Sequence, residues 1–545
     1  MKGISPFLER SCKISAEFLQ AAVIIDDQAY PADESEDVIP EHIELMEHEL
    51  ADLTDKEVPS AVTTALKGNN PIDTKGLVRA FAERGIVCAV IEPPKDLGMS
   101  QLAAACRSAD IAIVDWYLHD LSGEYAKTLI RHLIEDAEAT YPHQFRLILI
   151  YTTEQNIEEI RDKIATMLNG LGRSVTPQRG EGTALRWGSW RFVVLAKPGT
   201  DVGSHLASYE VPYADFANRA IHEFAKAVCG ILPNVALSGL SAVRRNTFRL
   251  LQRLSSELDP AFITHRALLP EPIDSEGHVV SLMASELSAI LEDEKVGTAA
   301  SLEAIRDWVE QKGFSYPLDV TCSQGSLRIP NPETLANLLE RGLEQYLRTK
   351  QTSLSEDKRE ALEKRVRKRL TKLLGGRSES EDERYAELTV LRPHYGGVAP
   401  FLTLGSILHD KERKLHWLCI QPRCDCVRLK DARPFLFLPL KEGGQFDFCK
   451  VSADMAPLRL LRNRKPYRIT TYTFKPDKTG VVRARRVANN YVFLTSSGKE
   501  LRWIGQLRDS IAQDVAQKVS SRLSRVGVDR SEWLRRVLPR DLRDP

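Results

Sequence analysis

The chain has 545 residues, enough for three or four domains of ordinary size. With 43% hydrophobic and 28% charged residues, its composition excludes a wholly disordered, collagen-like or membrane-embedded chain. The formal net charge of +0 hides an asymmetry, because residues 1–400 hold 45 Lys and Arg against 60 Asp and Glu, whereas residues 401–545 hold 30 against 15. An acidic front and a basic tail indicate two different tasks, or two parts that dock on each other.

Several features of the sequence favour a cytoplasmic protein without a membrane partner. No window supplies the ~20 uninterrupted apolar residues that a membrane-spanning helix needs. The first twenty residues lack the apolar core and small-residue cleavage site of a secretory signal. The nine cysteines are scattered and odd in number, which is not the pattern of a disulfide framework.

The first 200 residues alternate short apolar runs with amphipathic stretches. Strands are expected at 21–25, 86–93, 111–116 and 146–153, with a fifth ending near residue 197, and helices at 74–84, 100–108, 123–137 and 156–168. An acidic insertion occupies about 32–72, and a loop rich in Gly, Arg and Ser occupies 170–188. This alternation predicts an α/β fold with a doubly wound parallel sheet, of flavodoxin-like strand order, over residues 1–210.

The remainder of the chain has a different pattern of hydrophobic residues. Residues 211–375 follow a helical period and end in a charged helix at 353–375, which fits either a surface helix or a dimerising coil of a homodimer. Residues 376–383 are the clearest linker. From 384 to 545 short β-type runs predict a basic, β-rich output domain, a small antiparallel barrel or sandwich, that closes with one or two helices.

Polar side chains follow the predicted strands in order: Asp26 and Asp27 after the first, Asp115 after the third, Thr152 after the fourth and Lys197 after the fifth. The carboxyl ends of parallel strands meet at one sheet edge, so these side chains are expected to converge. Three converging carboxylates repel one another, and Mg²⁺ with its preference for oxygen ligands relieves that repulsion. The pattern therefore predicts a magnesium site at which Asp115 accepts a phosphoryl group.

The segments VIIDD, ADIAIVDW, LILIYTT and VLAKPG, taken in this order, resemble the receiver domain of two-component response regulators over about residues 20–210. The resemblance implies that Asp115 is the phospho-acceptor and that Asp26 and Asp27 hold Mg²⁺ with it. It also implies that Lys197 pairs with the phosphoryl oxygens and that Thr152 hydrogen-bonds one of them. The donor would be a histidine kinase or a GHKL-type ATPase, and no enzymatic activity beyond self-phosphorylation is expected.

The sequence departs from the receiver pattern in several places. The acidic insertion separates the first strand from its helix, and 44 residues separate Thr152 from Lys197. The position of the usual switch aromatic holds Val194, with Phe192 nearby, and His119 replaces a frequent Pro. Thr153 is an alternative to Thr152. An interaction scaffold that is never phosphorylated is therefore an alternative to a working receiver.

The large insertions and the unfamiliar output region also resemble receiver-like proteins of bacterial conflict (anti-phage) systems, which are encoded beside ATPases of the kinase or chaperone type. This resemblance implies a protein partner of that class.

The basic tail offers a different candidate function. Cationic residues that would contact phosphates are Arg462, Arg464, Lys465, Arg468, Arg483, Arg485 and Arg486. Aromatic residues that would stack on bases lie between or beyond them: Tyr467, Tyr472, Phe474, Tyr491 and Trp503. Such a mixture predicts a nucleic-acid-binding effector. The alternative is a solvated strand surface, or one that docks on the acidic front, and no known DNA-reading motif is present.

His416, Cys419, Cys424 and Cys426 lie within eleven residues of one another. Their spacing lacks the paired CxxC of structural zinc sites. We expect a hairpin of two strands with the cysteines packed as small hydrophobic side chains. A metal site, or a cysteine nucleophile paired with His394, His409 or His416, is the alternative.

Overall fold

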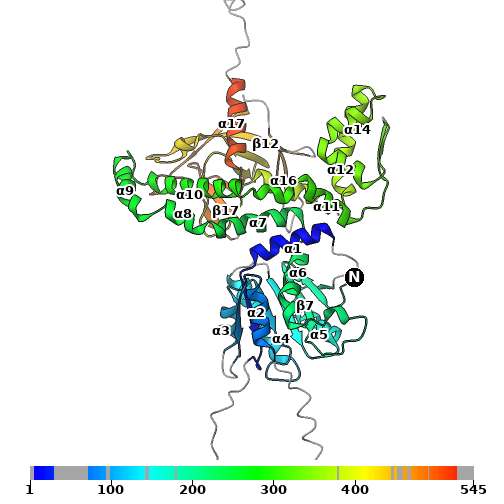
Figure 1. Ribbon diagram of the computed structural model, residues 1–545. Helices are drawn as coiled ribbons and strands as arrows, with labels where there is room; N and C mark the ends of the chain where they lie inside the picture. The colour runs from blue at the N-terminus through cyan, green and yellow to red at the C-terminus, as the bar shows by residue number, and fades with distance from the viewer. Residues whose placement is uncertain are drawn as a thin grey trace, which may run out of the picture. The chain divides into compact units, whose positions relative to one another are not determined.

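The computed structural model describes residues 5–29, 72–93, 98–140, 146–177, 181–323, 325–376, 380–443, 447–450, 458–462, 468–488 and 490–523. The predicted acidic insertion lies outside these residues, Ile72 excepted. Contacts divide the chain into two compact units, the first formed by residues 1–315 and 331–342 and the second by residues 316–330 and 343–545 (Figure 1). None of the described helices is long and apolar enough to cross a bilayer.

The first unit contains a seven-stranded sheet with the order β2-β1-β3-β4-β7-β6-β5. Its strands are β1 (Ala21–Ile25), β2 (Val87–Ile91), β3 (Ile111–Val114), β4 (Arg146–Thr152), β5 (Thr176–Pro177), β6 (Ala184–Trp187) and β7 (Trp190–Ala196). The five strands from β2 to β7 are parallel, in the 2-1-3-4-5 order of the flavodoxin-like folds. The predicted doubly wound sheet is confirmed.

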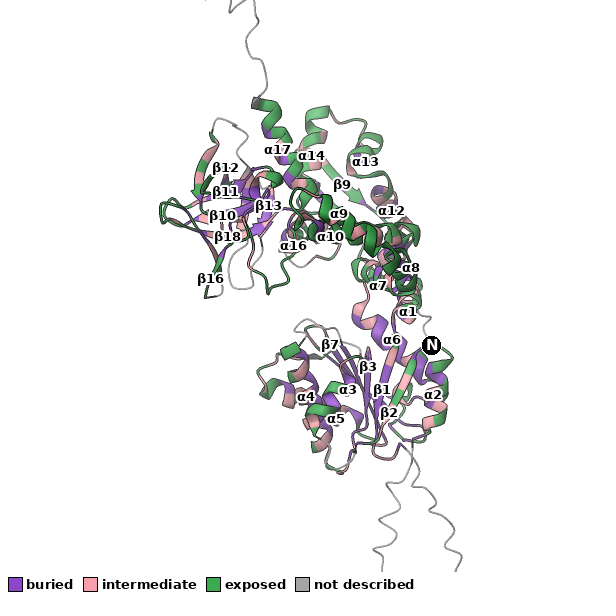
Figure 2. Cartoon of the chain, turned by 90° about the vertical axis from the view of Figure 1, so that its left-hand side faces the viewer, coloured by how far each residue is buried: buried purple, intermediate pink, exposed green. Residues whose placement is uncertain are grey.

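Helices cover both faces of this sheet (Figure 1). They are α2 (Thr74–Ala82) and α6 (Phe216–Val228) on one face, and α3 (Met99–Cys106), α4 (Glu124–Thr140) and α5 (Ile157–Gly170) on the other. The central strands are buried on both sides, which explains their continuous apolar runs. The edge strand β2 is half exposed, and Figure 2 colours it mainly green and pink.

Two strands lie where the sequence indicated a loop. β6 forms an antiparallel hairpin with β7 through the turn Gly188-Ser189, and β5 pairs with β6. The loop prediction for 170–188 was therefore wrong for these strands. The reason is that β6 is only four residues long and begins after a polar, glycine-rich stretch, so its pairing with β7 is what defines it.

A helix that the sequence did not indicate precedes the sheet. α1 (Pro6–Phe18) starts at Ser5, whose side chain accepts a hydrogen bond from the Leu8 N–H. It packs against α6 and against α7 (Ile231–Arg245) and α11 (Leu302–Lys312). The Phe18 ring stacks on Phe224 of α6 at 5.8 Å. α1 thus joins the receiver-like sheet to the helices that follow it within the first unit.

The helical part of the first unit also contains α8 (Thr247–Arg253), α9 (Asp259–Leu268), α10 (Asp274–Asp293) and α12 (Pro332–Arg341). α9 has no buried residue and α10 has only Ser275, so these two helices contribute little to the core.

The second unit is built on a nine-stranded antiparallel sheet that curls. Its strands are β10 (Ser406–Asp410), β11 (Leu415–Cys419), β12 (Arg433–Glu442), β13 (Phe448–Lys450), β14 (Leu458–Arg462), β15 (Thr470–Phe474), β16 (Arg485–Val487), β17 (Asn490–Leu494) and β18 (Glu500–Gln506). Each face buries an apolar cluster, and α17 (Asp509–Leu523) packs into one of them. The strand-rich C-terminal half agrees with the expectation from the sequence.

The other elements of the second unit are a small hairpin and several helices: β8 (Leu318–Cys322), β9 (Gly325–Ile329), α13 (Leu343–Lys350), α14 (Glu356–Arg367), α15 (Leu370–Leu373) and α16 (Ser380–Val390). The hairpin lies within the predicted helical region. The single helix expected at 353–375 is two helices, and α16 begins inside the predicted linker.

Candidate functional site

Four neighbouring strands bring their polar end residues to one sheet edge. The backbone continues the ladder beyond the strands, since Asp115 N–H donates to the Ile25 carbonyl at 2.9 Å and Lys197 N–H donates to the Thr152 carbonyl at 2.8 Å. The side chains that follow the strands therefore start from adjacent backbone positions. The predicted convergence of the strand ends is visible in the geometry of three side chains.

Lys197 lies between two carboxylates. Its Nζ is 3.0 Å from Asp26 Oδ2 and 3.0 Å from Asp115 Oδ2, and all three side chains are buried. Burial raises the pKa of the Asp115 carboxyl to about 6, with the charge of Lys197 opposing the rise and that of Asp26 adding to it. Burial alone would lower the pKa of Lys197, but the two carboxylates outweigh burial and raise it. One ammonium group thus neutralises only part of the acidic cluster.

The remaining carboxylate oxygens form a set suited to a divalent cation. One oxygen from each of Asp26, Asp27 and Asp115 lies within 4.8 Å of the others. Asp27 Oδ1 and Asp115 Oδ1 are buried and have no hydrogen-bond partner among the described residues. A buried carboxylate oxygen without a partner is costly, and a hard cation with oxygen ligands such as Mg²⁺ satisfies it. The residues present therefore fit the ion that receiver domains typically bind.

His119 positions Asp27, a role that the sequence did not reveal. Its backbone N–H donates to Asp27 Oδ2 at 2.8 Å, and its ring Nε2 lies 2.6 Å from the Pro93 carbonyl oxygen. The backbone of His119 is left-handed, with φ of 57°. In the sequence this residue was noticeable only as a departure from a frequent Pro.

Thr152 is fully buried at the end of β4, and its hydroxyl accepts a hydrogen bond from the Glu154 N–H at 3.1 Å. Thr153 is half-buried. Beside them the Tyr117 hydroxyl donates to Glu154 Oε2, which links the loop after β3 to the loop after β4. This hydrogen bond lowers the pKa of Glu154. Nothing in the sequence pairs these two residues, since 37 positions separate them.

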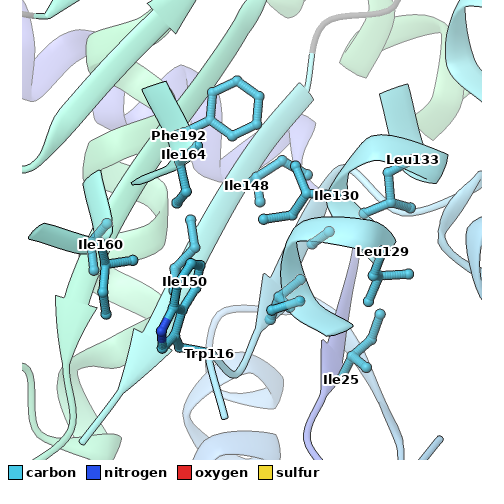
Figure 3. Close-up of a cluster of buried hydrophobic side chains, with 14 of the residues drawn as sticks. Ile25, Trp116, Leu129, Ile130, Leu133, Ile148, Ile150, Ile160, Ile164 and Phe192 are labelled. Carbon is cyan, nitrogen blue, oxygen red and sulfur yellow. The ribbon is translucent and has the colours of Figure 1, made fainter. Parts of the chain in front are cut away.

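The aromatic residues near β7 belong to the core. Val194 and Phe192 are both buried in the cluster under α4 and α5, and Phe192 stacks on Trp190 at 6.1 Å. Trp116, which follows Asp115, lies in the same cluster beside Ile150 (Figure 3). Gly123 has φ of +75°, and a Cβ there would overlap the Trp116 indole. Three residues before the lysine, where receivers usually have an aromatic residue, this chain has the buried Val194.

The other sequence candidates lie in the second unit. Arg468, Arg483, Arg485 and Arg486 are exposed, while the side chain of Arg462 and residues Arg464 and Lys465 lie outside the described part of the chain. Phe474 is buried in the core, whereas Tyr491 and Trp503 line a cavity.

Of the two strands predicted for the cysteine hairpin, the first is present and the second is not. Cys419 lies in a strand, β11, as expected, but Arg423–Cys426 form a 3₁₀ turn in place of a second strand, because Pro422 and the turn that it starts interrupt the pairing. Cys419 and Cys426 are buried in one apolar cluster, and Cys424 is exposed.

Comparisons with known proteins agree with this geometry. The family model described as the response receiver domain matches residues 18–202. The chain gives no significant match to a curated protein or to a solved structure. The matched segment contains all four strand ends and the acidic cluster. Residues 18–202 therefore form a divergent receiver domain, the domain type of response-regulator signalling proteins.

Proposed function

We propose that this chain is a response regulator in which Asp115 accepts a phosphoryl group from a histidine kinase or a GHKL-type ATPase. The observation that carries the proposal is the environment of Asp115: Oδ2 contacts Lys197, while Oδ1 is buried with no hydrogen-bond partner among the described residues. An acceptor aspartate needs one oxygen with free lone pairs next to a site for positive charge.

The chemistry follows from the side chains present. A carboxylate oxygen of Asp115 forms a bond to the phosphorus of a phosphohistidine as the P–N bond breaks, and the departing ring nitrogen keeps the electron pair. Asp26, Asp27 and Asp115 would hold Mg²⁺, which would supply positive charge beside the transferred phosphoryl group. Lys197, which already reaches Asp115, is placed to pair with one of the phosphoryl oxygens.

Thr152 is the candidate reporter of the modification. Its hydroxyl accepts a hydrogen bond from Glu154 and has its own proton available to donate. Donation of that proton to a phosphoryl oxygen would shift the loop that carries Glu154 and, through its hydrogen bond, Tyr117. We propose that this loop pair takes the place of the aromatic switch and alters an interaction surface or the C-terminal output.

The test is phosphoryl uptake from acetyl phosphate or phosphoramidate with Mg²⁺, followed by intact mass and by a phosphate-affinity gel. The wild-type chain is expected to gain one phosphoryl group and Asp115→Asn none. Asp162→Asn, which changes an exposed aspartate of the same domain, is the matched control and should behave as wild type.

A wild-type chain that binds Mg²⁺ but takes up no phosphoryl group from either donor, and does not bind beryllofluoride as an analogue of that group, would contradict the proposal. It would favour the unphosphorylated scaffold instead.

A further inference from the structure

The second unit contains a large cavity between α16 and the curled sheet. It has a volume of about 1030 Å³ and is lined by α16, by the segment that follows α16, and by residues of β13, β17 and β18. A neighbouring cavity of about 440 Å³ shares the wall residues Arg392, Pro393, His394, Tyr395 and Trp503. The two cavities thus form one groove, which we call the α16 groove.

The walls of the α16 groove are held in place by ion pairs. Lys450 of β13 lies 2.8 Å from Glu387 of α16, and Arg459 Nε of β14 donates to the buried Glu383 of α16 at 2.6 Å. The Arg392 backbone N–H donates to β18 at 2.8 Å. These contacts fix both α16 and the following segment against the sheet.

The groove carries positive charge. Its cations include Arg384, Arg392 and Arg508, and among the described lining residues the only acidic one is Glu387, which Lys450 neutralises. Arg508 donates to a backbone carbonyl at 2.8 Å and keeps its full charge. Within the described part of the chain, the guanidinium groups of Arg384 and Arg392 have no ion-pair or hydrogen-bond partner. Two of the cations are therefore available to an anion.

Aromatic rings line the same groove. His394, Tyr491 and Trp503 meet edge to face, with centroids 5.1 to 6.0 Å apart. The Trp503 indole N–H is buried and unpartnered among the described residues. Tyr395 at the mouth is 94% exposed and precedes Gly396 and Gly397, whose φ values of 82° and 83° favour glycine.

We infer that the α16 groove binds single-stranded nucleic acid, with bases stacked on Tyr395 and Trp503 and phosphates at Arg384 and Arg392. This function is separate from phosphoryl acceptance by Asp115. Aromatic faces beside partnerless arginines are the combination that single strands use, because every base offers a π-face and every nucleotide a phosphate.

The exposed ring and the size of the groove favour a single strand over a duplex or a free nucleotide. A duplex hides its base faces inside the stack, so it offers nothing to Tyr395. A free nucleotide fills only part of two adjoining cavities, whereas successive nucleotides of one strand occupy both. The occupant is therefore a strand.

The test is fluorescence anisotropy of full-length protein with short fluorescein-labelled oligouridylate and oligothymidylate. A labelled duplex and unlabelled mononucleotides serve as competing probes. Two pairs of variants separate the groove from general electrostatics. Arg384→Gln/Arg392→Gln removes the partnerless cations of the groove, and Arg485→Gln/Arg486→Gln removes two exposed cations of β16 outside it. Tyr395→Ala removes the exposed ring, and Tyr385→Ala removes a ring of α16 that is 56% exposed and does not line the groove.

Binding of a single strand is expected to fall about tenfold or more in Arg384→Gln/Arg392→Gln, with the slope of log K against log salt reduced by about 1.4. Tyr395→Ala should weaken binding about fivefold to hundredfold. Both control variants should bind as wild type. Since all six substituted residues are exposed, none of the changes should affect folding.

Three outcomes would overturn the inference. The first is no binding of a single strand, and the second is equal loss in the groove and β16 variants, which would mean diffuse electrostatic attraction. The third is a preference for duplex or mononucleotide over a single strand.

Discussion

At the residue scale, the receiver site depends on one lysine shared by two buried carboxylates. Lys197 satisfies Asp26 Oδ2 and Asp115 Oδ2, and it leaves Asp115 Oδ1 and Asp27 Oδ1 unsatisfied. The pKa of Asp115, raised to about 6 by burial, places the titration of this carboxyl just below neutral pH. A proton and a bound Mg²⁺ would therefore compete for the same oxygens.

This competition predicts a pH-dependent affinity for Mg²⁺. Below the raised pKa the proton occupies Asp115, so binding of Mg²⁺ should be about tenfold weaker at pH 5 than at about pH 7.5. Isothermal titration calorimetry with MgCl₂ at the two pH values measures the ratio of the two affinities. In Asp115→Asn the pH dependence should disappear along with most of the affinity. An equal affinity of the wild type at both pH values would mean that Asp115 is not a ligand.

At the scale of elements, a buried ion pair ties α6 to the receiver sheet. Arg191 of β7 donates to Glu223 of α6 through Nε at 3.2 Å, and both side chains are almost fully buried. Burial alone would raise the pKa of Glu223, but the neighbouring His222 ring and the charge of Arg191 outweigh it and hold this pKa well below its usual range. α6 also stacks on α1, so this pair anchors the connection between the sheet and the helices.

Glu223→Gln should destabilise the chain by about 3 kcal/mol near neutral pH, because it removes the more deeply buried of the two carboxylates, Glu223 and Glu181, that pair with the buried Arg191. A depressed pKa stabilises the fold above the unfolded value near 4.5, so the difference from wild type should shrink as the pH falls below about 4.5. Urea unfolding at several pH values measures the difference in the free energy of unfolding between Glu223→Gln and the wild type.

Glu83→Gln breaks an exposed ion pair of α2 and is the control, with an expected cost under about 1 kcal/mol. A difference between Glu223→Gln and wild type that stays constant down to low pH would show that charge is not the cause.

At the scale of the whole molecule, the two units have separate apolar cores. The clusters on the receiver sheet belong to the first unit, and those of the curled sheet belong to the second. Separate cores predict two unfolding transitions, since domains with their own cores unfold as their own cooperative units.

Calorimetry should resolve these two transitions. Mg²⁺ with beryllofluoride should raise the midpoint temperature of only one of them. At a ligand concentration of about 100 Kd the stabilisation is about 2.7 kcal/mol, or a shift of about 5 °C for a unit of this size. Asp115→Asn should abolish the shift and leave the other transition in place. A single transition that moves as a whole would show instead that the units unfold together.

Much of the receiver domain could be predicted from the sequence. Apolar runs of strand length alternate with amphipathic helices, and each run ends in a polar residue, so the order of elements and the residues at the sheet edge are local properties of the chain. Asp26, Asp27, Asp115, Thr152 and Lys197 were all identified in this way. The roles assigned to them stay predictions until phosphoryl uptake is measured.

Other features depended on the tertiary structure, because they join residues that are far apart in the chain. β6 is defined by its pairing with β7, and α1 by packing against three distant helices. Tyr117 reaches Glu154, and Arg392 shares a groove with Tyr491, only after the chain has folded. The sequence by itself determined the alternation of elements and the acidic strand ends, since both arise from local hydrophobic periodicity. Only the folded chain decided which side chains remain without partners, because that depends on every neighbour in space.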